Sequence, residues 1–349
     1  MKARIAILIF LFIAAFVLIL DAGKIERRQF QVDTTTPIKF IIPGGWPKPP
    51  TNIFSTNPLT EEGFQLGRKL FYDGRLSKDG NFACASCHQQ FAAFATYDHD
   101  LSHGFHDQFT TRNAPPLFNL AWKRFYHWDG GINHIEVQAL SPMTASNEMA
   151  ENVDSVLGKL KTDTSYVRMF KSAFGTSLIN SQRMLKALAQ FVGTLISSNS
   201  KYDKVKRGEA TFNSAEEHGY ELYKMNCSSC HKEPLFTDNS YRNNGLALNS
   251  FLKDYGRMRI TGDPSDSLKF IVPSLRNVSV TFPYMHDGRL YSLYKVIDHY
   301  TSGIQPSPTL DSLLRKPIIL STAEKNDLVY FLHTLKDTSF LNDKRFSQP

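Results

Sequence analysis

Cysteine is scarce in this chain: only four of its 349 residues are cysteines, so cysteine-based sites must be few. Polybasic runs and nucleic-acid motifs are absent, and the formal net charge of +7 comes from scattered Lys and Arg residues, so we expect no nucleic-acid partner. Strand-like alternation of apolar and polar residues is rare, which argues against a β-rich fold. A hydrophobic content of 42% is normal for a globular protein, and the length allows two domains.

All four cysteines lie in two five-residue stretches with the pattern Cys-x-x-Cys-His. In this pattern the two thiols add across the vinyl groups of a haem, and the adjacent histidine ligates the iron. We therefore predict two covalent c-type haem groups. The first is attached through Cys84, Cys87 and His88, and the second through Cys227, Cys230 and His231, with both histidines as iron ligands.

A zinc site and a pair of redox disulfides are the alternative interpretations of four cysteines. A zinc ribbon usually brings its second Cys-x-x-Cys back after a short loop, whereas 143 positions separate Cys84 from Cys227 here. Zinc would not require a histidine in the same place after each pair. A thioredoxin-like dithiol would stand in a βαβ context, which is absent around both motifs. Haem is therefore the favoured prediction.

The N-terminus has the layout of an export signal, because Lys2 and Arg4 precede an apolar run over residues 5–20. Haem c is attached after export, so we expect a periplasmic protein. The run is short of the ~20 residues that a membrane span needs, and no clear cleavage site follows it. Residues 1–23 are thus predicted to be a cleaved signal peptide or an N-terminal membrane anchor. Residues 24–54, rich in Pro, Thr and charge, are predicted to form an irregular leader outside the core.

Several elements recur in the same order, so the remaining chain is predicted to contain two copies of one unit. A stretch with helical signals precedes each haem motif, Gly-Phe-Gln-Leu at 63–66 and Gly-Tyr-Glu-Leu at 219–222. Each unit closes with an amphipathic stretch, at 188–195 and at 328–335. The predicted helix-capping boxes are Ser214 with Glu217 and Ser321 with Glu324.

A helix before the haem and a helix after it is the layout of a small cytochrome c domain. We therefore predict a mostly α fold of two cytochrome c-like helical domains packed together, each carrying one covalent haem. The predicted ranges are residues 55–205 for the N-terminal domain and residues 206–345 for the C-terminal domain.

Further motifs accompany the haem motifs. They are Arg112-Asn113-Ala114-Pro115, His127-Trp128-Asp129-Gly130, Asn147-Glu148-Met149, Pro273-Ser274-Leu275-Arg276-Asn277 and Pro283-Tyr284-Met285-His286-Asp287-Gly288. With these motifs the chain resembles the bacterial dihaem cytochrome c peroxidases and their relative MauG, the dihaem enzyme of methylamine utilisation. The resemblance implies that the N-terminal haem meets hydrogen peroxide, and that the C-terminal haem accepts electrons from a small donor such as a cytochrome c or a cupredoxin. Family members are often dimers, so a homodimer is a further expectation.

Peroxide chemistry needs a group that moves a proton from the near to the far oxygen. The resemblance makes Glu148 the candidate, with Gln138 beside it over the first haem and Pro142 shaping the same pocket. The alternative for Glu148 is a solvated carboxylate at a helix start. Trp128 resembles the tryptophan between the haems, where an aromatic ring offers a route for electrons. Its alternative is a buried core aromatic, and both roles are compatible.

The candidate ligand opposite His88 on the first iron is His103, which fits the family position better than the neighbouring His99 and His106. The alternative is an exposed loop histidine and an open iron face. Family peroxidases often carry such a loop histidine, which leaves the iron when the other haem is reduced. The resemblance thus implies a switchable site.

Tyr300 is the candidate ligand opposite His231 on the second iron. It stands where cytochrome c peroxidases have a methionine and where MauG has a tyrosine. A thioether raises the haem potential, whereas a phenolate favours ferric iron and higher oxidation states. The alternatives are a sulfur ligand from Met285 or Met258 and a core role for Tyr300.

A calcium ion between the two domains is also implied by the resemblance. Asn113, Thr281 and Pro283 match the positions that hold it, although only Asn113 offers an obvious side-chain oxygen. The alternative is a hydrogen-bonded turn without a metal.

Three functions are open from the sequence. The favoured one is a periplasmic dihaem cytochrome c peroxidase that reduces hydrogen peroxide to water, with electrons relayed from the C-terminal to the N-terminal haem. The second is a MauG-like enzyme that oxidises a partner protein through a high-valent dihaem state, which Tyr300 favours. The third is a non-catalytic dihaem electron carrier, against which Glu148, Gln138 and Trp128 argue.

Overall fold

The computed structural model describes residues 35–349, so the predicted signal or anchor at 1–23 and the predicted leader up to residue 34 lie outside the described residues. Residues 36–349 form one compact unit. Within the described range, no helix has the length and apolar character that crossing a membrane requires.

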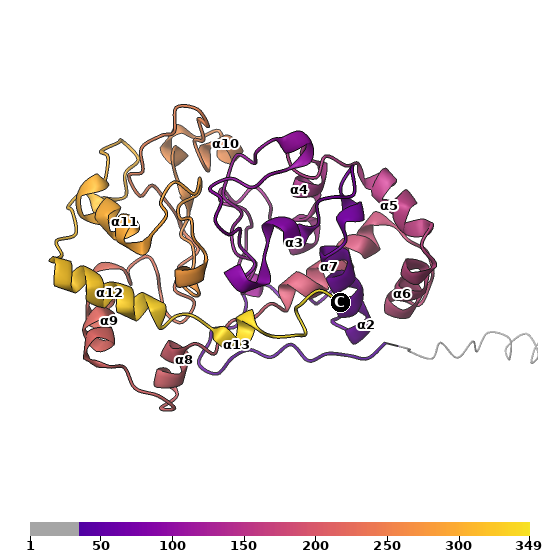
Figure 1. The fold of residues 1–349 in the computed structure, drawn as a ribbon, viewed down its shortest axis with the longest axis horizontal. Helices are drawn as coiled ribbons and strands as arrows, with labels where there is room; N and C mark the ends of the chain where they lie inside the picture. The colour runs from indigo at the N-terminus through magenta and orange to yellow at the C-terminus, as the bar shows by residue number, and fades with distance from the viewer. Residues whose placement is uncertain (1–34) are drawn as a thin grey trace, which may run out of the picture. The chain divides into compact units, whose positions relative to one another are not determined.

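The described chain is mostly helical, as predicted (Figure 1). The α-helices are α2 (Glu61–Phe71), α3 (Cys84–Cys87), α4 (Leu140–Thr144), α5 (Val153–Lys161), α6 (Thr164–Phe174), α7 (Ser181–Gly193), α8 (Lys201–Lys206), α9 (Ser214–Asn226), α10 (Met258–Thr261), α11 (Leu293–Asp298), α12 (Thr322–His333) and α13 (Thr338–Leu341). A π-helical turn, His299–Gly303, extends α11. The described sheet is minimal, with β1 (Tyr241–Arg242) antiparallel to β2 (Phe270–Ile271).

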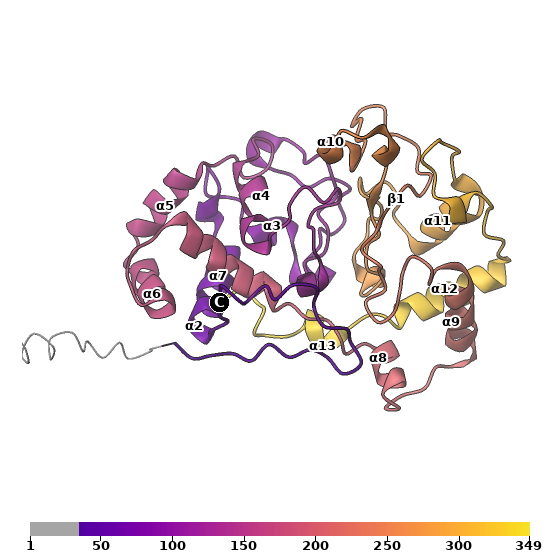
Figure 2. The same cartoon turned by 180° about the vertical axis from the view of Figure 1, so that it is seen from behind.

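Buried apolar side chains of the described residues form two main clusters. The first is built largely by α2, α5, α6 and α7 around Phe191, and the second by α8, α9, α11 and α12 around Phe331. Figures 1 and 2 show these two groups of helices apart from each other. We call the described chain up to the end of α7 the first half, and the chain from α8 to the end of α12 the second half. Phe340 and Phe346, near the C-terminus, return to the first cluster. The predicted domain ranges stay a prediction.

One close helix pair lies in each half. Gly67 of α2 is so close to α7, and Gly219 of α9 so close to α12, that a Cβ at either position would overlap a backbone carbonyl of the partner helix. Glycine permits this approach because it has no side chain. The structural counterpart of Gly219 is therefore Gly67. The predicted match with Gly63 is wrong by four residues, which is about one helical turn.

The predicted closing helices are confirmed as α7 and α12. Ser321 and Glu324 form the predicted reciprocal capping box of α12. The box that opens α9 is formed by Asn213 and Glu216, one residue before the predicted pair. Asn213 takes this role because its backbone is extended and its side chain accepts a hydrogen bond from the Glu216 N–H at 2.9 Å.

Residues 36–54 of the leader contain no helix but pack against the folded chain. The Trp46 ring lies 4.9 Å from the Trp122 ring, and the Arg276 guanidinium lies 4.6 Å from the Trp46 ring. Arg276 is fully buried and donates two hydrogen bonds of 2.8 Å to Asp203. The leader is thus irregular, as predicted, but its end belongs to the packed structure.

The close approach of α9 and α12 predicts opposite effects for two Gly→Ala substitutions. We expect Gly219→Ala to lower the free energy of unfolding by about 1–3 kcal/mol, because the new methyl group must push the helices apart. Gly158→Ala, on the exposed face of α5 with open space around it, should instead raise it by up to about 1 kcal/mol. Guanidinium denaturation followed by circular dichroism measures both, and equal effects would contradict the close packing.

Candidate functional site

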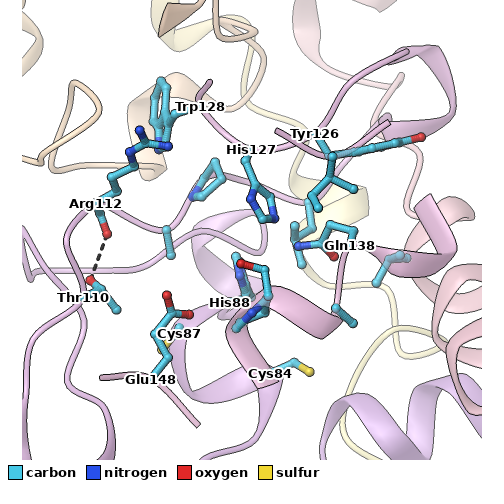
Figure 3. A pocket seen from close by; sticks show the side chains of 18 of the residues that line it. Cys84, Cys87, His88, Thr110, Arg112, Tyr126, His127, Trp128, Gln138 and Glu148 are labelled. Atoms are coloured by element: carbon cyan, nitrogen blue, oxygen red, sulfur yellow. Dashed lines mark hydrogen bonds between the residues drawn. The ribbon is translucent and has the colours of Figure 1, made fainter. Parts of the chain in front are cut away.

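The first haem motif forms a single turn of helix, α3, that ends at His88. The His88 N–H bonds back to the carbonyl of Cys84 at 2.9 Å. The ring Nδ1–H of His88 donates to the carbonyl of Phe94 at 2.8 Å, which leaves Nε2 as the nitrogen with a free lone pair. Cys84, Cys87 and His88 all line one cavity of about 510 Å³ (Figure 3).

This donor set fits a covalently held haem. Burial lowers the pKa of His88 to about 4, so its imidazole is neutral at pH 7, the form that ligates iron. Burial raises the pKa of the Cys84 thiol to about 12, so it is not a thiolate ready to bind a metal. The cavity lies in the size range of small-molecule sites in proteins, and much of its wall is apolar.

The second haem motif repeats this arrangement at the end of α9. The His231 Nδ1–H donates to the carbonyl of Pro273 at 3.0 Å, with the carbonyl of Phe236 at 3.3 Å. Burial lowers the pKa of His231, which again keeps the imidazole neutral. The backbone carbonyl of His231 accepts a hydrogen bond from the Tyr223 hydroxyl. Both histidines are therefore held by backbone carbonyls in one tautomer and orientation.

The cavity wall around the first motif brings together most of the predicted residues of that site. The lining includes Glu148, Gln138, Pro142, Trp128, His103 and Asn113. Glu148 follows α4, and burial raises the pKa of its carboxyl. Figure 3 shows this carboxyl in the same cavity as His88 and Gln138. Glu148 is partly buried, unlike the fully solvated carboxylate of the alternative interpretation.

Trp128 lies where the two halves meet. Its indole Nε1–H donates to the carbonyl of Asn113 at 2.8 Å, and its own carbonyl accepts from the Ile271 N–H of β2 at 2.8 Å. The residue is only 9% exposed. These bonds hold the ring and its backbone from both sides, so the side chain is a fixed aromatic group between the halves.

Arg112 forms ion pairs with both halves at the junction, the region beside Trp128 where the two halves meet. It donates to both carboxylate oxygens of Asp254 in the second half, at 2.6 and 2.8 Å. Its third contact is Asp129 in the first half, at 2.6 Å. The Asp254 side chain is only 3% exposed, so this is a largely desolvated ion pair. Sequence reasoning named Arg112 within a motif but did not find Asp254, which lies 142 positions away.

Known proteins of similar sequence match most of the chain. A family model for di-haem cytochrome c peroxidases matches residues 61–211. The chain is 37% identical over 286 residues to the methylamine utilization protein MauG of Methylorubrum extorquens, a match that covers 80% of each chain. The chain belongs to the di-haem cytochrome c peroxidase and MauG family. It is therefore an oxidoreductase of a family with two haem groups.

Two further comparisons support this membership. The cytochrome c551 peroxidase of Nitrosomonas europaea is 33% identical over 260 residues, which cover 70% of this chain and 75% of that protein. A crystal structure of a MauG-like protein associated with microbial copper homeostasis superposes with a TM-score of 0.80 at 34% identity, covering 89% of this chain and 99% of that one. Relatives thus include both peroxidases and MauG proteins.

The candidate distal ligand of the first haem, His103, is exposed and lines the cavity. Its ring packs against Phe109 at 4.6 Å and against His99 at 5.4 Å. His106 instead stacks on Phe105 at 4.0 Å. Neither His99 nor His106 is among the residues that line the cavity. His103 is therefore the loop histidine best placed for this role, which stays a prediction.

The candidate distal ligand of the second haem, Tyr300, lies in the π-helical turn after α11. Such turns occur frequently at functional sites. Burial raises the pKa of Tyr300, and the Cys227 and Cys230 thiols add to this effect, so the phenol is near the second haem motif. The Asn244 side chain donates to the Met285 sulfur at 3.4 Å and also bonds Tyr300. Both candidate ligands are thus linked by one amide.

The predicted calcium residues lie in adjoining segments. The Asn113 N–H donates to the carbonyl of His286 at 2.9 Å. This bond places Asn113 beside the segment that contains Thr281 and Pro283. The Asn113 side-chain amide donates to the carbonyl of Asp100 at 3.1 Å. A hydrogen-bonded turn accounts for these contacts, and calcium stays a prediction.

Sequence reasoning missed His127 and Lys123 as residues of the cavity wall. His127 belongs to a motif that was noted for Trp128, yet its own ring lines the cavity and is buried enough to lower its pKa. Lys123 also lines the cavity. It follows the apolar residues Leu120–Trp122, and nothing in that local pattern shows which way its ammonium points.

The Arg112 pair predicts a large loss of stability in Asp254→Asn. The substitution keeps the shape of the side chain but leaves Arg112 with one carboxylate, and breaking a buried pair on one side costs about 3–5 kcal/mol. Glu209→Gln is the matched control, because Glu209 pairs with Arg207 on the exposed surface. Guanidinium denaturation of both holoproteins gives the two losses. Equal losses would show that the junction pair is no stronger than a surface pair.

Proposed function

We propose that this protein is a periplasmic dihaem cytochrome c peroxidase that reduces hydrogen peroxide to water. The observation that carries the proposal is the convergence of Glu148 and Gln138 on the cavity that holds Cys84, Cys87 and His88. A plain electron carrier needs no partly buried carboxylate beside its haem. The reaction consumes one peroxide, two protons and two electrons and yields two water molecules.

Glu148 is the proposed proton shuttle. A haem held by His88, Cys84 and Cys87 would supply the redox-active iron for peroxide reduction. Because burial raises the pKa of Glu148, its carboxylate is a better base than an exposed one, and it can take the proton of the near oxygen and give it to the far oxygen. Gln138 provides an amide that can orient the peroxide by hydrogen bonds. Pro142, also in the wall, cannot donate a backbone hydrogen bond and shapes the pocket.

Electrons are proposed to enter at the second haem and cross the junction at Trp128. The indole Nε1–H donates to the carbonyl of Asn113, and the backbone carbonyl of Trp128 accepts from the Ile271 N–H. The proposed donor is a small periplasmic redox protein, a cytochrome c or a cupredoxin. The proposed ligands opposite the proximal histidines are His103 for the first iron and Tyr300 for the second, and a calcium ion at Asn113 is proposed with them.

The proton-shuttle role predicts a strong effect of Glu148→Gln. The variant keeps the volume of the side chain but cannot accept a proton, so we expect peroxide consumption to slow by about 10²- to 10⁴-fold. Both haems should remain attached. Glu217→Gln, on the exposed face of α9, is the control and should keep the wild-type rate. A Glu148→Gln protein with the wild-type rate would remove Glu148 from the mechanism.

The proposed function is tested by stopped-flow absorption of the holoprotein mixed with hydrogen peroxide, in the fully ferric and the half-reduced forms. Reduced cytochrome c is added afterwards. We expect rapid oxidation of the cytochrome, fastest from the half-reduced form, because reduction of the second haem is proposed to free the first iron from His103. A protein that changes its spectrum with peroxide but leaves the cytochrome reduced would contradict the peroxidase proposal.

Tyr300 favours a second candidate, a MauG-like oxidation of a partner protein. A phenolate ligand lowers the potential of the second haem, which makes it a poorer acceptor of electrons from a cytochrome. In that case the oxidised dihaem state should persist for long after peroxide is added, and Tyr300→Met should shorten its lifetime. The same stopped-flow experiment thus separates the two candidates.

A further inference from the structure

Within the described part of the chain, the cavity of the first haem motif is lined by a partly buried lysine whose charge has no partner. Arg112 is fully engaged by Asp129 and Asp254. Arg259 lies 3.7 Å from Asp254, and its side chain is more than half exposed to solvent. Lys123 lines the cavity, and within residues 35–349 its ammonium has no hydrogen bond and no carboxylate within ion-pair distance.

The surroundings of Lys123 make this unpaired charge costly. The residue follows the turn Leu120–Trp122, and its N–H bonds back to Leu120 at 3.0 Å. Burial alone lowers the pKa of the ammonium to about 8. The side chain nevertheless keeps some accessible surface, and these two facts agree when the accessible part faces the cavity that Lys123 lines. Buried ammonium groups of this kind are normally paired with an anion.

Among residues 35–349, no anionic group pairs with the Lys123 ammonium. Glu148, the free carboxyl group in the same wall, has its pKa raised by burial, with no effect from Lys123, so the two groups are not close partners. Asp129 is already bound to Arg112. Hydrogen peroxide is uncharged at neutral pH and does not need a cation at this depth. The remaining anions are the two propionate groups that every haem carries.

We propose that the Lys123 ammonium binds a propionate of the haem attached at Cys84 and Cys87 and thereby raises the reduction potential of that haem. The inference rests on the haem of the proposed function but not on peroxide turnover. A positive charge beside the haem stabilises the ferrous state, which has one more electron than the ferric state. Lys123 also lies near the second half, because the Asn239 side chain donates to the carbonyl of the preceding Trp122 at 3.3 Å. Its charge is thus placed on the side from which electrons are proposed to arrive.

The test compares Lys123→Met with Lys123→Arg. The first variant removes the charge at similar length, and the second keeps it. Lys171→Met, on the exposed last turn of α6, is the matched control for loss of one lysine. Haem content is measured by the pyridine haemochrome method, and the potential of each haem by spectroelectrochemical titration in the absence of peroxide.

We expect Lys123→Met to lower the potential of the first haem, with at least a tenfold smaller equilibrium constant for its reduction. Lys123→Arg should keep the potential of the first haem close to the wild-type value, and Lys171→Met should leave it unchanged. In Lys123→Met the potential of the second haem should change less than that of the first. A fully loaded Lys123→Met protein with an unchanged first potential would overturn the proposal. So would a shift of equal size in Lys171→Met.

A second readout covers the case in which Lys123→Met does not fold or load haem. Resonance Raman spectra report the bending mode of haem propionates, which responds to their hydrogen bonds. Lys123→Arg should shift this band, because a planar guanidinium replaces a compact ammonium. An unchanged band would overturn the proposal. Neither readout uses peroxide, so failure of the peroxidase proposal would leave the result on Lys123 intact.

Discussion

The ion pair of Arg112 with Asp254 is the constraint on which the rest of the site depends. A two-pronged bond between a guanidinium and a carboxylate fixes distance and angle together, and here it joins the first half to the second. The third contact of Arg112 is Asp129, the residue after Trp128. Asn113, the residue after Arg112, accepts the indole hydrogen bond of Trp128. The Trp128 indole is therefore positioned by the same few residues that hold the two halves together.

The haem motifs and the closing helices could be predicted because their signals are local. Two thiols and an imidazole within five residues must share one turn of chain, and the apolar spacing of α7 and α12 depends only on the helical period. A local signal also explains why the repeat was aligned at Gly63 instead of Gly67. Gly63 and Gly67 lie four residues apart on one face of α2, and a Cβ on either would collide with α7. The sequence pattern fits both, and only the contact geometry chooses Gly67.

Contacts between distant parts of the chain left no local signal, so they could not be predicted. Asp254 is separated from Arg112 by 142 positions and stands in no motif that was recognised. Lys123 follows a short apolar turn and precedes Arg124, and this pattern does not show that a cavity is beside it. Glu148 and Gln138 were found by family resemblance, and the structure adds that they share one cavity with His88. The π-helical turn at Tyr300 is a matter of backbone geometry, which a residue count from α11 does not contain.

The two halves share their haem motif and their close helix pair but not the walls that face the motifs. Identical attachment chemistry would give two similar iron centres, so a difference in their potentials would come from axial ligands, hydrogen bonds and nearby charge. In the first half the candidate groups are a partly buried Glu148, Lys123, which has no ion-pair partner among the described residues, and an exposed loop histidine. In the second half they are Tyr300 and the amide of Asn244. In the proposed function a proton acceptor is needed where peroxide is reduced, and a buried phenol is proposed for the site that only transfers electrons. The repeat thus provides two similar motifs for haem, and in the proposed function the residues outside the repeat give the two sites their different roles.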